Sequence, residues 1–129
     1  TRIKGWSRSR KLLFKLMANS FINKKVDLTT TDLTTLYTVP SFNSAIIKSL
    51  LVSEDAGSGT TITITLVNAS GTIFNLFKNK AIGSKATTEL LTQPLIMEES
   101  EVLKVQAADA NELHVIASIL EIQPREVTT

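Results

Sequence analysis

The chain has 129 residues, no cysteine and a formal net charge of +2, so it has the size of one ordinary domain and cannot form disulfides or thiolate metal sites. Hydrophobic residues make up 43% and charged residues 20% of the chain, a balance that excludes a largely disordered protein. Residues 1–16 hold six of the 14 basic residues and no acid, which leaves residues 17–129 with a net charge of −4.

The basic segment over residues 1–16 (TRIKGWSRSRKLLFKL) interleaves cations with apolar residues. We expect an N-terminal arm that packs on a neighbouring subunit. Its candidate partner-binding residues are Arg2, Lys4, Trp6, Arg8, Arg10, Lys11, Leu13, Phe14 and Lys15. Three other interpretations stay open, because clustered cations beside a tryptophan are also typical of nucleic-acid contacts, of membrane-surface helices and of mitochondrial-type targeting segments.

The sequence after the arm predicts a compact domain over residues 17–124 and a polar tail over residues 125–129. A helix would fit only around residues 9–20. The first strand is expected within residues 21–31, at a sheet edge where Lys24 and Lys25 discourage stray pairing. No apolar run approaches the roughly 18 residues that a membrane-spanning helix needs.

The stretch from residue 36 to residue 68 is the part around which the domain is expected to be organised. A short strand over residues 33–39 ends at Pro40, which lacks a backbone donor for the ladder. The next strand, residues 45–53, is apolar on both faces, which is typical of a strand inside a sandwich or beside an interface. Strict alternation places Ile47 and Leu51 on one face, with Ile46, Leu50 and Val52 on the other.

Residues 54–59 contain two glycines and are predicted to be the tip of a β-hairpin that leads into the strand over residues 60–68. That strand alternates isoleucine and leucine with threonine. The pattern predicts that one face of the strand is buried and that the threonine face is exposed to solvent. The core face is Ile62, Ile64 and Leu66, and the exposed face is Thr61, Thr63 and Thr65.

Further strands follow over residues 72–80, 87–92, 94–97, 102–107 and 113–122. The last of these is apolar on both faces, which predicts a central strand. About eight short strands with turns every 8 to 12 residues or so predict an all-β fold, an antiparallel β-sandwich of the jelly-roll type.

Residues that carry chemistry are sparse. His114 is the only histidine and lies in an alternating strand, so a structural role is favoured over catalysis. The acids of residues 98–101, with Asp109 and Glu112, are candidate calcium ligands, but a solvated turn is favoured. The Gly57-Ser58-Gly59 loop lacks the lysine of a phosphate loop, and no nucleophile elbow is present. We therefore expect no enzyme, no cofactor and no metal.

Three stretches carry a resemblance to a known class of proteins. They are MANSFINKKVDLTTTDLTTLYTVP (residues 17–40), AIIKSLLVSEDAGSGTTITITLVN (45–68) and LHVIASILEI (113–122). Together they resemble small virion structural proteins of tailed bacteriophages, especially marine and cyanobacterial phages, of the capsid decoration, neck or tail accessory type. The basic arm departs from that pattern.

The resemblance implies a non-enzymatic protein of the virion that decorates or stabilises the capsid, or joins neck and tail components. Its partners would be copies of itself and a major capsid, neck or tail protein, with nucleic-acid contact by the arm as a weaker option. No membrane and no small-molecule substrate is implied. The alternative is a receptor- or glycan-binding module of a phage tail or fibre, for which the aromatic candidates are Trp6 and Tyr37.

Overall fold

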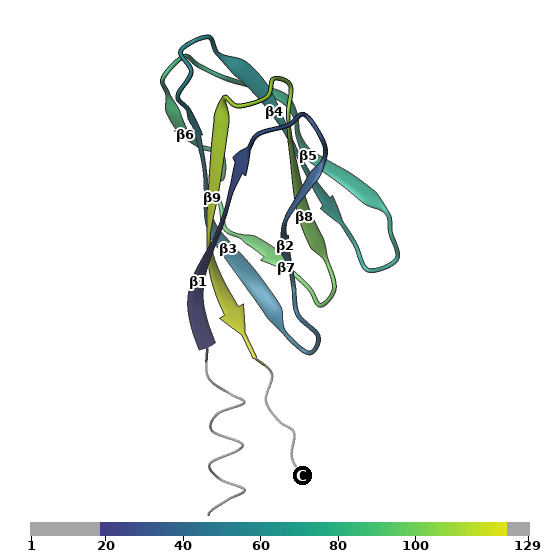
Figure 1. Cartoon of the computed structure of the whole chain (residues 1–129). Coiled ribbons are helices and arrows are strands. Elements are labelled where there is room, and N and C mark those ends of the chain that lie inside the picture. Colours follow the sequence, from purple (N-terminus) through teal and green to yellow (C-terminus); the bar gives the residue numbers. More distant parts are fainter. Residues whose placement is uncertain (1–18, 124–129) are drawn as a thin grey trace, which may run out of the picture.

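The computed structural model describes residues 19–123, and this part of the chain is built from strands without a helix (Figure 1). The strands are β1 (Asn19–Leu28), β2 (Thr34–Thr38), β3 (Ser44–Glu54), β4 (Thr60–Val67), β5 (Ile73–Ile82), β6 (Thr87–Glu89), β7 (Leu95–Met97), β8 (Val102–Ala107) and β9 (Leu113–Ile122). A helix able to cross a membrane is therefore not found within residues 19–123.

The strands form two antiparallel sheets that face each other (Figure 1). One sheet, here called sheet A, has the order β1-β9-β3-β6, with β7 also on β3, and the other, sheet B, has the order β2-β8-β4-β5. Strands β6 and β7 pair with successive parts of β3, so they are two halves of one interrupted strand.

The pairing shows that the fold is a jelly roll. The antiparallel pairs are nested, as in one long hairpin whose tip is the turn at residues 68–72. From the outside inward the pairs are β1 with β9, β2 with β8, β3 with β6 and β7, and β4 with β5. Pairing of β9 with β3 and of β8 with β4 winds this hairpin into two sheets. The expected β-sandwich of jelly-roll type is confirmed.

The hairpin predicted around residues 54–59 is wrong. Strand β3 lies in sheet A between β9 and β6/β7, and β4 lies in sheet B between β8 and β5. The loop therefore crosses from one sheet to the other. The true hairpin tip of this region follows β4, where the N–H of Asn68 donates to the carbonyl of Thr72 at 3.0 Å.

A β-bulge in β3 changes which residues enter the core. Its register against β9 shifts between Ile47 and Ser49, so Lys48 is an extra residue in the ladder. Ile47, Leu50 and Val52 are all buried, whereas Leu51 is exposed. Alternation therefore holds on each side of Lys48, but the prediction that Ile47 shares a face with Leu51 is wrong.

Strand β4 supplies the core as predicted, since Ile62, Ile64 and Leu66 are buried. The threonine face, which was predicted to be exposed to solvent, is only partly exposed. Thr61 and Thr63 are half-buried, but Thr65 is buried and its hydroxyl has no hydrogen-bond partner. The predictions that β1 is an edge strand and β9 a central one are both confirmed by the strand order of sheet A.

The two ends of the sandwich differ in what they carry. One end holds the connections at residues 29–33, 55–59, 83–86 and 108–112, and is called the loop end. The other holds the connections at residues 39–43, 68–72 and 98–101. Because Asn19 pairs with Ile122, both ends of the described chain also lie there (Figure 1). This second end is called the terminal end.

Candidate functional site

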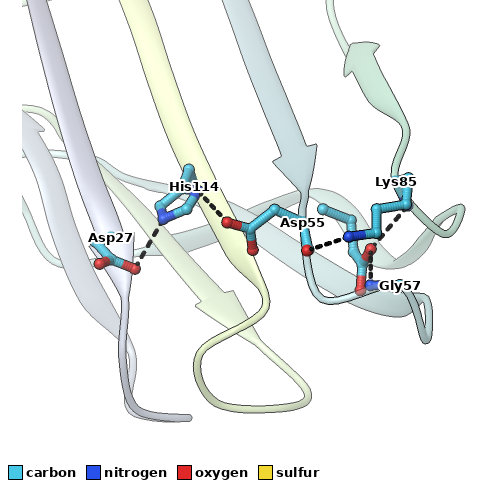
Figure 2. Close-up of polar contacts among 6 residues, drawn as sticks. Asp27, Asp55, Gly57, Lys85 and His114 are labelled. Atoms are coloured by element: carbon cyan, nitrogen blue, oxygen red, sulfur yellow. Dashed lines mark hydrogen bonds and ion pairs between the residues drawn. The ribbon is translucent and has the colours of Figure 1, made fainter.

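Glu54 organises the loop end. It is the last residue of β3, and its side chain is only 1% exposed. Its Oε1 accepts hydrogen bonds from the backbone N–H of Gly57 at 3.0 Å and of Lys85 at 2.9 Å (Figure 2). Its Oε2 accepts from the N–H of Ser58 and Gly59. One carboxylate thus joins the loop after β3 to the connection between β5 and β6.

These donors make Glu54 a fixed anion. The backbone N–H of Lys85, followed by those of Gly57 and Gly59, lowers the pKa of Glu54 to about 2, although burial acts in the opposite direction. A carboxyl group that is ionised throughout the physiological range and enclosed by backbone donors is not available as a general acid. Its role is structural.

The connection between β8 and β9 is tied to the same loop. The Ser58 hydroxyl donates to Glu112 Oε1 at 2.9 Å, and the Thr60 hydroxyl donates to Asp109 Oδ2 at 2.7 Å. The Ser58 bond lowers the pKa of Glu112, but burial, Glu54 and Asp109 outweigh it, so the pKa is raised overall. Both acids serve as acceptors that hold the loop.

His114 lies between two aspartates on the outer face of sheet A. Its Nε2 is 3.2 Å from Asp27 Oδ1, and its Nδ1 is 3.7 Å from Asp55 Oδ2 (Figure 2). The histidine is half-exposed on β9, and the aspartates come from β1 and from the loop after β3. Ser53 of β3 is the cross-strand partner of His114 on the other side. The ion pairs of the histidine are with the two aspartates, and their evident effect is to link the loop to the sheet.

The acids weighed as calcium ligands are separated by the fold. Residues 98–101 lie at the terminal end, where the N–H of Glu98 donates to Glu101 Oε1 at 2.8 Å, whereas Asp109 and Glu112 lie at the loop end. Within residues 19–123, no group of three or more histidine, aspartate or glutamate side chains is arranged to hold a metal ion.

The outer face of sheet A carries apolar side chains at its terminal end. Phe21 of β1 pairs with Leu120 of β9, Leu120 with Ile46 of β3, and Ile46 with Ile96 of β7, so a line of apolar residues crosses the sheet. Phe21 is 78% and Ile96 68% exposed. Paired residues of an antiparallel ladder share one face, so all four point outward.

Two neighbours extend this line. Ile122 lies two residues after Leu120 on β9, so it is on the same face, where it pairs with Asn19 and Ser44. Phe42, in the β2–β3 connection, is 77% exposed. A recess of about 370 Å³ lies between Phe42, Ile122 and Glu99. The outer apolar patch is defined here as Phe21, Phe42, Ile46, Ile96, Leu120 and Ile122.

Acidic residues border the patch on one side. Glu98 and Glu99 follow β7 directly, within three residues of Ile96, and both are exposed. On the next outward row of the sheet, Asn23 and Ser118 pair with each other, so the patch is bounded by polar groups there as well. An apolar centre with a polar and acidic rim has the composition of a protein contact surface.

A second apolar recess, of about 400 Å³, opens where the edges of the two sheets meet at β5 and the β6–β7 segment. Its lining is Leu76, Phe77, Leu90, Leu91, Thr92, Gln93, Pro94 and Leu95. Neither recess contains the convergent polar groups that fix the orientation of a small ligand.

The sequence pointed to the arm as the contact region, but Arg2, Lys4, Trp6, Arg8, Arg10, Lys11, Leu13, Phe14 and Lys15 lie outside the described residues. Tyr37, an aromatic candidate for sugar stacking, is buried and donates its hydroxyl to Glu121 Oε2 at 2.7 Å. The sequence pattern does not reveal the outer apolar patch, because apolar residues on both faces of β9 predict a strand buried on both sides, whereas Leu120 and Ile122 lie on the outer face.

The sequence matches no protein-family model and no curated protein. The structure is similar to a chain of the acid-stable capsid of Helicobacter pylori bacteriophage KHP30, with a TM-score of 0.54 over 87% of this chain and 94% of that chain, at 13% identity. The chain shares its fold with a component of a bacteriophage capsid.

Two other phage capsid chains align with lower scores. A chain of the cyanophage Pam1 capsid aligns over 82% of this chain and 85% of its own at 18% identity, with a TM-score of 0.42. A pentameric capsid protein from metagenomic phage sequences aligns over 83% of this chain and 62% of its own at 18% identity, with a TM-score of 0.38.

Proposed function

We propose that this chain is a non-enzymatic structural protein of a bacteriophage virion. The observation that carries the proposal is the similarity of nearly the whole jelly roll to a chain of the KHP30 capsid, which covers 94% of that chain. The sequence resemblance to small virion proteins of tailed phages supports it independently. In this role the sandwich contacts copies of itself and other virion proteins.

The surface chemistry supports contact with protein. The polar side chains of the loop end are engaged in holding the loops, as the four backbone N–H groups on Glu54 illustrate. The outer apolar patch instead presents large side chains to solvent, and a contiguous apolar patch with a polar rim is typical of an interaction site. A decorating or joining subunit needs such a surface and no catalytic group.

In the finer form of the proposal, the sandwich decorates the capsid or joins neck and tail components, and residues 1–16 anchor it. An arm adds contact area per subunit without enlarging the core. Its apolar residues, Leu13 and Phe14 among them, would supply the burial, and its six cations would meet acidic protein surface.

Deletion of residues 2–16 tests the anchoring role. Particles produced with the full chain should retain it through a high-salt wash, and particles produced with the truncated chain should lack it, as measured by quantitative mass spectrometry. The purified truncated chain should melt like the full chain, because the described core lies within residues 19–123. Retention of a correctly folded truncated chain at full-length levels would overturn the anchoring role.

A charge-only variant identifies what the arm contacts. Replacing Arg8, Arg10 and Lys11 with glutamine removes half of the arm's six cations and so weakens phosphate affinity, but it leaves Leu13 and Phe14 in place. We expect this variant to remain in the particles at a substantially higher level than the deletion. If it is lost as completely as the deletion, and only from particles that contain nucleic acid, the arm binds nucleic acid rather than protein.

A further inference from the structure

We infer that the outer apolar patch is the docking site for residues 11–16 (KLLFKL) of a second copy of this chain. The inference deepens the proposed function, on which it rests, by naming the surface and the segment through which two copies are joined. Its support is the geometry of the patch, the chemistry of the segment and the point at which the segment leaves the sandwich.

The patch has the shape needed to receive a short apolar segment. The cross-strand line from Phe21 through Leu120 and Ile46 to Ile96 spans β1, β9, β3 and β7, and therefore crosses the whole width of sheet A at that level. The recess beside Phe42 and Ile122 lies one residue pair further toward the terminal end. Together they offer a continuous apolar surface with a depression at one side.

The segment matches the patch in polarity and charge. Residues 12, 13, 14 and 16 are leucine or phenylalanine, and Lys11 and Lys15 lie on either side of Leu13 and Phe14. Glu98 and Glu99 border the patch, and Glu99 also lines the recess. Apolar side chains would therefore cover apolar side chains while lysines meet glutamates at the rim, which favours this segment over an uncharged apolar one.

The position of Asn19 indicates a second copy rather than the same chain. Asn19 begins β1 at the terminal end, and only Met17 and Ala18 separate it from residue 16. A reversal within two residues would place the segment beside the edge of β1 rather than over the outer face, and neither residue is a glycine or proline that favours a tight turn. Residues 17 and 18 span at most roughly 7 Å, so the patch that receives the segment must belong to a neighbour whose outer face lies next to the terminal end of this sandwich.

Cysteine cross-linking of the full chain tests the inference, because the chain has no cysteine of its own. Phe14→Cys and Ile46→Cys are purified separately, mixed and oxidised, and the products are separated without reductant and mapped by mass spectrometry. We expect a disulfide-linked pair that contains one chain of each variant. Ala110→Cys replaces Ile46→Cys in the control, since Ala110 is exposed at the loop end, and this mixture should give at least tenfold less of the mixed pair.

Each other result overturns the inference in a recognisable way. Equal linking of Phe14→Cys to Ile46→Cys and to Ala110→Cys, or linking to neither, means that the segment has no site on the patch. Efficient linking of Ile46→Cys to itself alone means that two patches meet directly. A further variant carries both Phe14→Cys and Ile46→Cys in one chain, and if its disulfide closes only within that chain, the arm folds back onto its own sandwich. In each case the protein can still be found in purified particles, so the proposed function is decided separately.

Discussion

At the scale of single residues, Glu54 shows how a buried charge can be a structural device. Its carboxylate has no cationic side chain as its main partner and instead accepts from four backbone N–H groups in two connections. Gly57 and Gly59, with φ of 93° and 73°, let the loop curl around it. A carboxylate next to a glycine-containing loop is the sequence signal for this arrangement, but Lys85, which supplies a further donor, is distant in sequence.

Replacing Glu54 with glutamine should lower the melting temperature at neutral pH, because an amide N–H₂ would then face backbone N–H donors. The pKa of Glu54 in the folded protein, about 2, is below its ordinary value of 4.5. The stabilisation is therefore present above pH 4.5 and is lost as the pH falls toward 2. The difference in melting temperature between wild type and E54Q should accordingly shrink across that window.

Differential scanning calorimetry of both proteins from pH 7 down to pH 2 measures this difference. Glu98→Gln is the matched control, since Glu98 is exposed, and it should leave the melting temperature almost unchanged. A gap between wild type and E54Q that is the same at every pH would show that the charge of Glu54 is not what stabilises the loop end.

At the scale of elements, predictions from local pattern were most accurate for β8 and β9, whereas β1 spans Asn19–Leu28 instead of the expected residues 21–31. The bounds expected for β8 and β9 agree with the structure, because both strands alternate without interruption. The facing of β3 was wrong, since Lys48 adds one residue and reverses the alternation beyond it. The hairpin was wrong as well, since the choice of β9 and β8 as partners depends on residues far along the chain.

Removing Lys48 should be far more damaging than changing it. Deletion forces either Ile47 or Leu50 out of register with the core, and should cost about 3 kcal/mol or more of the free energy of unfolding, in the range of a large core truncation. Lys48→Ala keeps the bulge and should change that free energy by no more than about 0.5 kcal/mol. Urea unfolding followed by circular dichroism measures both.

A deletion variant that is as stable as Lys48→Ala would show that β3 can slip without loss and that the bulge is not required. If the deletion variant fails to fold while Lys48→Ala folds normally, the bulge is needed to place both halves of β3 against the core. The comparison isolates the effect of the bulge, because both variants remove the lysine side chain and only the deletion shortens the backbone.

At the scale of the whole molecule, the fold class was predictable and the surface was not. The count and spacing of strands predict a jelly roll, but the nested pairing that defines it joins residues as far apart in the sequence as Asn19 and Ile122. The outer apolar patch arises only from that pairing, since its members come from four strands and a turn. The contact residues proposed for the arm remain predictions.

The most direct test of the virion role is a cryo-electron microscopy reconstruction of particles from cells that produce this chain. We expect density into which the sandwich of residues 19–123 fits at repeated positions, with additional density over the outer apolar patch that continues from β1 of a neighbouring copy. Particles whose shell, neck and tail are fully explained by other proteins, with this chain recovered only outside the particles, would contradict the virion role.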